Sequence, residues 1–254
     1  MSASLQIEVR NQVLWLTINR PEKRNALNLA LLDEIGETLA RYAAATDIKL
    51  ALLTGAGDKA FAAGGDLKEL NAVRSEAETL AMSRRARQAL DQIRYFPLPV
   101  VGAINGLALG GGGELALACD LRIAAPHAEI GLIQSRLNVT TAWGGGIDLL
   151  NLVGDSRALH LLITGQRITA NEALQLGIIN AIADPALDFP TAIDAFLAPY
   201  LAHNQQVIRG YKAMTLAHRK HLHETLDRVE EKQFVKTWIH EDHWVAAAQA
   251  LGKK

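Results

Sequence analysis

The most constraining feature of this sequence is a nearly apolar, glycine-rich segment that runs from Phe96 to Cys119. Only Asn105 and Glu114 are strongly polar within it. The segment is long enough to cross a bilayer, but its two prolines and six glycines disfavour one continuous helix. We therefore expect a buried strand, a tight turn and a buried helix, and no membrane span.

The rest of the composition is that of an ordinary globular protein. The chain has 254 residues, of which 49% are apolar and 21% charged, so it can bury a core without disulfides. Its formal charge of -1 lacks the basic footprint of a nucleic-acid binder, and no nucleic-acid partner is expected. A single cysteine and the absence of a basic, then apolar leader predict a cytoplasmic protein in a reducing compartment.

Strand-like and helix-like patterns alternate through the first two thirds of the chain. A hairpin is predicted at Leu5–Val9 and Val13–Ile18, and buried strands at Leu50–Leu53, Val100–Ile104 and Leu121–Ala124. Helices are predicted from near Asn28 and from about Glu76 to Arg94. Strands separated by helices indicate βαβ units and an α/β fold.

Beyond about Pro190 the strand patterns stop and helices are predicted. Their ranges are Ala192–Leu201, Gln205–Leu216, His223–Lys236 and Thr237–Leu251. Their apolar stripes need a cover, either from this chain or, as the sharper hypothesis, from a neighbouring subunit. A group of histidines near the end is interpreted as solvated helix residues and not as a metal site: His218, His221, His223, His240 and His243.

The glycines are the chemically informative residues, because the usual nucleotide-hydrolase, serine-hydrolase and zinc-protease motifs are absent. Four of them, Gly110–Gly113, lie between a predicted buried strand and the start of a predicted helix. Glu114 follows directly after them. Glycine costs about 1 kcal/mol inside a helix, whereas free N–H groups at a helix start can bind developing negative charge. Close helix–strand packing, with Glu114 as a first-turn acid, is the structural alternative.

A second turn of this kind, Ala60–Leu67, also follows a strand and precedes a helical segment. Two backbone donors from two separate turns could hold one carbonyl oxygen from two sides. The pair of turns therefore favours an oxyanion site over simple packing.

Four blocks in this order resemble the crotonase superfamily, the enoyl-CoA hydratase/isomerase family. They are Asn19–Leu27 (NRPEKRNAL), Ala60–Leu67 (AFAAGGDL), Asn105–Asp120 (NGLALGGGGELALACD), and Leu162-Thr164-Gly165 followed by Ala173–Ile179. The resemblance covers roughly residues 5 to 185. It implies a crotonase-like spiral of ββα repeats over residues 1–190. It also implies a C-terminal helical section over residues 191–254 that packs trimers, often paired as hexamers.

The resemblance also implies an acyl-CoA thioester substrate and no metal or cofactor, since coenzyme A belongs to the substrate. By position, the N–H groups of Gly65 and Gly111 would form the oxyanion hole, and Glu114 would be the acid/base. Lys23 and Arg24 would lie near the CoA phosphates. The other positions implied to contact the substrate are Ala26, Ala62, Gly64, Asp66, Leu67, Gly110 and Trp143.

Two departures from the family pattern leave the reaction open. Family hydratases use two glutamates, but Gln134 stands at the second position, and glutamine cannot act as a general base. The run Ala142-Trp143-Gly144-Gly145 is more similar to the ethylmalonyl/methylmalonyl-CoA decarboxylase branch. We therefore expect a hydratase or isomerase with Glu114 moving the proton, with decarboxylation of a short malonyl-type CoA as the alternative. A non-catalytic CoA- or RNA-binding relative is the remote alternative, because this sequence retains the two oxyanion glycines and Glu114.

Overall fold

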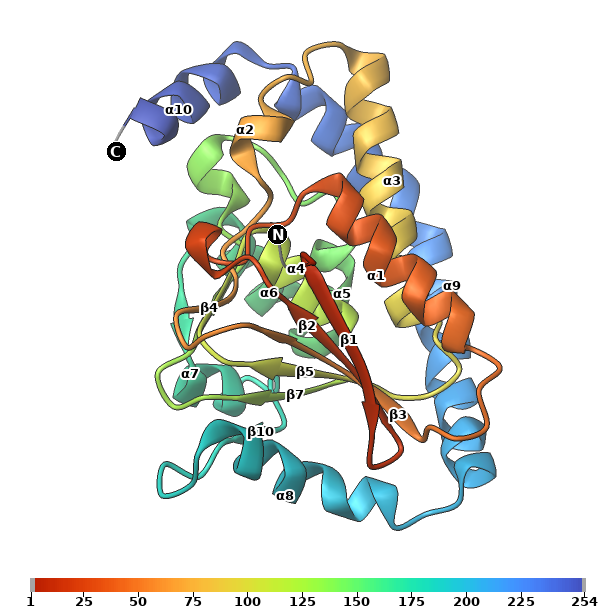
Figure 1. Ribbon diagram of the computed structural model, residues 1–254. Helices are drawn as coiled ribbons and strands as arrows, with labels where there is room; N and C mark the ends of the chain where they lie inside the picture. Colours follow the sequence, from red (N-terminus) through yellow and green to blue (C-terminus); the bar gives the residue numbers. More distant parts are fainter. Residues whose placement is uncertain (1–2, 253–254) are drawn as a thin grey trace.

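The computed structural model describes residues 3–252 and contains two sheets wrapped by helices (Figure 1). The six-stranded sheet has the order β1 (Leu5–Arg10), β2 (Val13–Ile18), β3 (Leu50–Gly55), β5 (Val100–Ile104), β7 (Leu121–Ala124) and β10 (Ala181–Ile182). The four-stranded sheet has the order β4 (Ala60–Ala62), β6 (Leu107–Leu109), β8 (Glu129–Gly131) and β9 (Ile168–Thr169). From β2 onward the larger sheet is parallel, as the βαβ pattern predicts.

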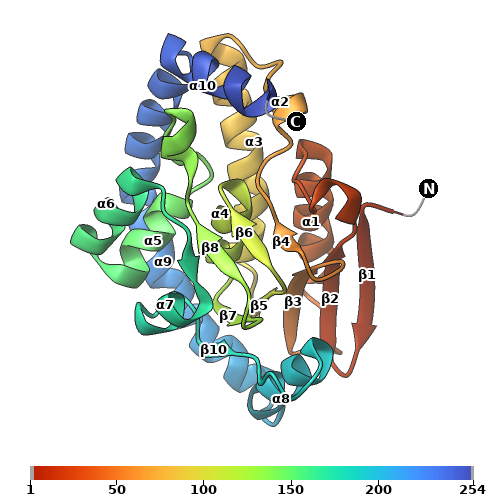
Figure 2. The same ribbon diagram turned by 90° about the vertical axis from the view of Figure 1, so that its left-hand side faces the viewer.

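Helices connect the strands and form the C-terminal part of the chain (Figure 2). They are α1 (Leu29–Tyr42), α2 (Leu67–Leu70), α3 (Glu76–Arg94), α4 (Gly111–Ala118), α5 (Gly145–Val153), α6 (Asp155–Thr164), α7 (Ala170–Gln175), α8 (Phe189–Leu201), α9 (Gln205–Trp238) and α10 (Glu241–Gly252). Short 3-10 turns occur at Pro21–Lys23 and Gln134–Leu137. Local chemistry sets several starts: Asn28 caps α1, and Ser75 with Glu78 forms a capping box on α3.

The six-stranded sheet is covered on both faces, which explains its continuous apolar strands. Along β2, Leu14 and Leu16 enter the main core, which also contains side chains of α1, α3 and α4. Val13 and Trp15 point to the opposite face, where α8 packs through Ile193 and neighbouring apolar residues. Figure 1 shows α8 lying beneath this sheet. The helical C-terminal section thus completes the core on that side.

The nearly apolar segment forms the predicted strand and helix, with one addition. After β5 the chain turns at Asn105-Gly106 and forms the short strand β6 in the second sheet before α4 begins. Within residues 3–252, no helix is both long and apolar enough to cross a membrane. The expectation of a buried strand–turn–helix unit is therefore confirmed.

Two expectations for the C-terminal section are wrong. Gln205–Leu216 and His223–Lys236 are parts of one 34-residue helix, α9, because the intervening charged residues continue the helix. His223 and His243 are not solvated: each is 1% exposed. His223 contacts buried carboxylates, and the His243 ring packs against aromatic side chains. Among residues 3–252, no cluster of three or more His, Cys, Asp or Glu could hold a metal.

Candidate active site

The start of α4 depends on glycines, because β-carbons at Gly111 and Gly112 would overlap neighbouring atoms. Gly110 has a φ of 54°, and its N–H donates to the carbonyl of Gly131 at 2.8 Å. Gly112 lies so close to the carbonyl group of Ala62 that a β-carbon there would overlap it. Gly111 is the first residue of α4, where N–H groups have no acceptor within the helix. The strand β4 and the start of α4 are therefore held in direct backbone contact.

The second glycine turn packs against the N-terminal segment. Leu27 N donates to Gly64 O at 2.9 Å, and Asp66 N donates to Leu27 O at 2.7 Å. Gly64 has a φ of 124°, which favours glycine. The carbonyl of Gly64 and the N–H of Asp66, which flank Gly65, therefore both point toward Leu27. Successive peptide groups of an extended chain point in opposite directions. The N–H of Gly65 is therefore directed away from Leu27.

The indole of Trp143 brings the two turns together. A β-carbon added to Gly111 would overlap its six-membered ring, and one added to Gly65 would lie 3.5 Å from its Cη2 atom. Trp143 is 4% exposed. One ring thus lies against both glycines of the expected oxyanion hole, which places Gly65, Gly111 and Trp143 in one site.

Glu114 is buried at this site and its carboxylate accepts three hydrogen bonds. Its Oε2 accepts from the N–H groups of Trp143 at 2.8 Å and Gly145 at 2.9 Å, and its Oε1 accepts from Gln134 Nε2 at 2.8 Å. Burial raises the pKa of Glu114 to about 7, and the charge of Glu230 contributes in the same direction. The three hydrogen bonds act against this rise. Such a carboxyl group is able both to accept and to donate a proton near neutral pH.

Gln134 lies where the expected second carboxylate would be, beside Glu114. Its amide nitrogen donates to Glu114, so its carbonyl oxygen is left as an acceptor. That Oε1 atom is buried and has no partner in the described structure. Gln134 therefore presents an acceptor that could hold a water molecule or a substrate hydroxyl, but no base.

The implied CoA-binding residues of the N-terminal signature lie beside the second turn. Lys23 and Arg24 are exposed, and Lys23 Nζ lies 3.6 Å from Asp66 Oδ2. Asp66 is also paired with Arg20 at 3.0 Å, and Arg20 donates a further bond to the carbonyl of Ala26. Leu67 begins α2 directly after Asp66. Sequence reasoning missed Arg20, although its place in the NRPEKRNAL block was a usable signal.

Sequence reasoning also missed Glu230 in α9. Its carboxylate accepts from Gly144 N at 2.9 Å, Gly146 N at 3.2 Å and Thr141 Oγ1 at 2.6 Å, and it pairs with Arg87 of α3. No motif in the charged sequence of α9 distinguishes Glu230 from its neighbours. Its role follows only from the packing of α9 against α5.

A buried charge cluster supports α5 from the other side. Asp148 is 2% exposed and accepts from Arg94 at 2.9 Å and Arg219 at 2.8 Å. His223 Nε2 lies 3.0 Å from its Oδ1 atom. Burial acts to raise the pKa of Asp148, but the two arginines outweigh it and hold that pKa well below its ordinary value. Arg94 also donates to the carbonyl of Trp143 at 2.7 Å, which joins this cluster to the site.

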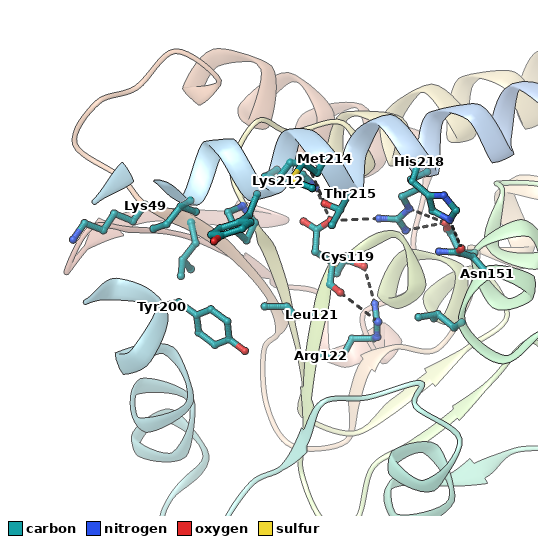
Figure 3. A pocket seen from close by; sticks show the side chains of 18 of the residues that line it. Lys49, Cys119, Leu121, Arg122, Asn151, Tyr200, Lys212, Met214, Thr215 and His218 are labelled. Atoms are coloured by element: carbon teal, nitrogen blue, oxygen red, sulfur yellow. Dashed lines mark hydrogen bonds and ion pairs between the residues drawn. The ribbon is translucent and has the colours of Figure 1, made fainter. Parts of the chain in front are cut away.

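A cavity of about 920 Å³ lies elsewhere, between α9, the end of α8 and the edge of the core (Figure 3). Tyr200, Lys212, Met214 and His218 are among its lining residues, and most of the lining is apolar. None of the sequence-predicted site residues lines it. Its size therefore does not make it the candidate active site.

Comparison with known proteins decides the family. The model of the enoyl-CoA hydratase/isomerase family matches residues 8–247. The chain belongs to this family. It is 36% identical over 180 residues to a short-chain-enoyl-CoA hydratase of Clostridium acetobutylicum, covering 71% of this chain and 69% of that protein. It is 35% identical over 207 residues to a crotonyl-CoA hydratase of Syntrophomonas wolfei, and the match covers 82% of this chain and 79% of that protein.

Solved structures agree with this assignment. A crystal structure of an enoyl-CoA hydratase from Bacillus anthracis is 32% identical, with a TM-score of 0.80 over 99% of this chain and 96% of that one. The crotonase-like α/β fold with a helical C-terminal section is thus confirmed, as is the resemblance to the family. These relatives favour the hydratase/isomerase interpretation over the decarboxylase alternative.

Proposed function

We propose that this enzyme adds water to a short 2-enoyl-CoA, with no cofactor beyond the coenzyme A of its substrate. The observation that carries the proposal is the placement of buried Glu114 beside the two glycines joined by Trp143. The N–H groups of Gly65 and Gly111 would bind the thioester oxygen as it gains negative charge. The pKa of Glu114, which is raised to about 7, suits a group that moves protons at neutral pH.

One carboxyl group can complete the reaction. Ionised Glu114 takes a proton from water as the water oxygen bonds to the β-carbon, and the C=C electron pair moves to form the enolate. Protonated Glu114 then returns that proton to the α-carbon, the enolate collapses to the thioester, and a 3-hydroxyacyl-CoA results. The unpartnered Oε1 of Gln134 would accept a hydrogen bond from the incoming water. In this scheme Gln134 orients the water molecule, and Glu114 transfers the proton.

The test compares hydration with decarboxylation. The enzyme is incubated separately with crotonyl-CoA, methylmalonyl-CoA and ethylmalonyl-CoA, and the products are followed by mass. We expect crotonyl-CoA to gain one water, and Glu114→Gln to lower the rate by about 10² or more. The matched control is Glu129→Gln, because Glu129 is 39% exposed at its side chain and pairs with Arg167 away from the site.

Three results would overturn the proposal. Full activity of Glu114→Gln would remove the assigned acid/base. Loss of CO₂ from a malonyl-type substrate without hydration of crotonyl-CoA would support the decarboxylase instead. A substrate that binds without any turnover would indicate a non-catalytic relative.

We also propose that the enzyme works in the cytoplasm as a homotrimer or a hexamer, with the cavity face of α9 as the contact region. Tyr211 and Met214 are each 70% exposed on this helix, and both line the cavity. Exposed apolar side chains gathered around a cavity are typical of a surface that a partner covers. Light scattering coupled to size exclusion should give three or six chains. A monomer at micromolar concentration would contradict this assembly.

A further inference from the structure

The turn from Trp143 to Gly146 is held by two carboxylates from two helices. Glu114 of α4 accepts from the N–H groups of Trp143 and Gly145. Glu230 of α9 accepts from those of Gly144 and Gly146. Four successive N–H groups thus alternate between the two carboxylates. This arrangement keeps Glu230 close to Glu114 although no bond joins them.

Glu230 is itself firmly placed. Its side chain is 8% exposed and pairs with Arg87. Arg87 also donates to the carbonyl of Ala142 at 3.2 Å and pairs with Asp227 of α9. Thr141 Oγ1 donates to Glu230 at 2.6 Å, so the segment that leads into the turn is attached to the same carboxylate.

We propose that Glu230 is a positioning residue for Glu114: it holds the turn that donates to Glu114 and keeps a negative charge beside it. This role rests on the proposed function, in which Glu114 transfers the proton. Glu230 contacts no reacting atom in this scheme. It acts by fixing where the N–H groups of Trp143 and Gly145 lie and by opposing the ionisation of Glu114.

The electrostatic part of the role agrees with the surroundings. After burial, the charge of Glu230 is the next cause that raises the pKa of Glu114. The other charged or titratable groups around the turn come from three helices: Arg87 and Arg94 of α3, Asp148 of α5, and Arg219, His223 and Asp227 of α9. Asp148 is paired with two arginines, whereas Glu230 shares the single Arg87 with Asp227. Of these acids, Glu230 is the one whose charge raises the pKa of Glu114.

The test measures the ionisation of Glu114 directly. Protein labelled with ¹³C at glutamate carboxyl carbons is titrated by NMR, and the Glu114 signal is assigned by its loss in Glu114→Gln. We expect Glu230→Gln to lower the pKa of Glu114 by about one pH unit, since a nearby like charge is removed. The pH profile of crotonyl-CoA hydration should move to lower pH by the same amount.

The matched control is Glu231→Gln. Glu231 is the next residue of α9 and pairs with another α3 arginine, Arg84, at 2.7 Å on the exposed side. It should leave the Glu114 titration unchanged. Glu230→Asp keeps the charge and should restore most of the parent profile, which a purely structural role would not predict.

A second variant covers the case in which Glu230→Gln does not fold. Arg87→Gln leaves the charge of Glu230 uncompensated and should raise the pKa of Glu114 instead. An unchanged Glu114 titration in Glu230→Gln, an equal shift in Glu231→Gln, or no upward shift in Arg87→Gln would each overturn the proposal. Because the titration needs no turnover, a parent that hydrates nothing would refute the proposed function while leaving this result readable.

Discussion

The indole ring of Trp143 lies against the backbone of Gly111 with no room for a β-carbon between them. This contact joins Trp143, one of the departures from the family's hydratase pattern, to a donor of the expected oxyanion hole. It makes both residues testable by substitution.

Gly111→Ala should lower activity by about 10² or more, because the added methyl group must displace the ring or the oxyanion donor. Steady-state hydration of crotonyl-CoA checks this. The control is Gly210→Ala in α9, where a β-carbon meets nothing within 4 Å. That variant should stay active and gain about 0.5–1 kcal/mol in unfolding free energy. An active Gly111→Ala would place the oxyanion hole elsewhere.

Trp143→Ala should widen the range of acyl chains. The buried ring occupies space against both glycines, where a bound acyl group would begin. We expect the ratio of kcat/KM for a ten-carbon over a four-carbon enoyl-CoA to rise about 10-fold or more. Trp143→Phe, which keeps most of the ring, is the control and should shift the ratio less. An unchanged ratio in Trp143→Ala would show that another wall limits the chain.

Gln134→Glu should raise the hydration rate by about 10- to 100-fold, because a carboxylate can act as a base where an amide cannot. The amide nitrogen of Gln134 lies 2.8 Å from Glu114 Oε1. In the variant, the carboxylates of residues 134 and 114 would therefore share a proton and titrate as a pair. The pH–rate profile should therefore acquire an additional step. Gln134→Met, similar in size but without hydrogen bonding, separates this gain from a change in packing. A slower Gln134→Glu enzyme would contradict the expectation that a carboxylate at this position adds a base, and it would show that the hydrogen bond from the amide to Glu114 matters more.

Asp148→Asn should destabilise the protein by about 3–5 kcal/mol at pH 7, because it leaves Arg94 and Arg219 buried without their shared partner. The pKa of Asp148 is lowered by folding, so its contribution is complete above about pH 5. It begins to decline as the pH falls past the unfolded value of about 3.9, and it is fully lost only below the much lower folded pKa. Urea unfolding at pH 7 and pH 3.5 should show a smaller difference at the lower pH. Asp194→Asn, on the exposed side of α8, should change stability by less than about 0.5 kcal/mol.

Much of the fold could be predicted from local sequence. The positive φ angles at Asn11 and Gln12 close the expected hairpin, and alternating apolar residues place β2 between two cores. Ser75 and Glu78 mark the start of α3. The spacing of apolar residues and the capping bonds each involve residues only a few positions apart, so both can be recognised in the sequence itself.

The parts that could not be predicted depend on contacts between distant residues. The continuity of α9 was missed because its middle is charged on most sides, and its buried residues such as Arg219 and His223 find acidic partners only in the folded chain. Arg20 and Asp66 are separated by 46 positions, and Arg87 and Glu230 by 143. Family resemblance supplied Glu114 and the glycines, but it carried no signal for Glu230.

The dependence of the Trp143–Gly146 turn on α9 has a consequence for the order in which the enzyme matures. The glycine turns, Glu114 and the Trp143–Gly146 turn all precede Glu230 in the chain, so the N–H groups of Gly144 and Gly146 gain their acceptor only after residue 230 has been synthesised. A protease cut in α9 before Glu230 would separate this carboxylate, together with Phe234 and Trp238 of the core, from the segment that contains the turn. We expect hydration activity to require an α9 helix that is intact through Glu230.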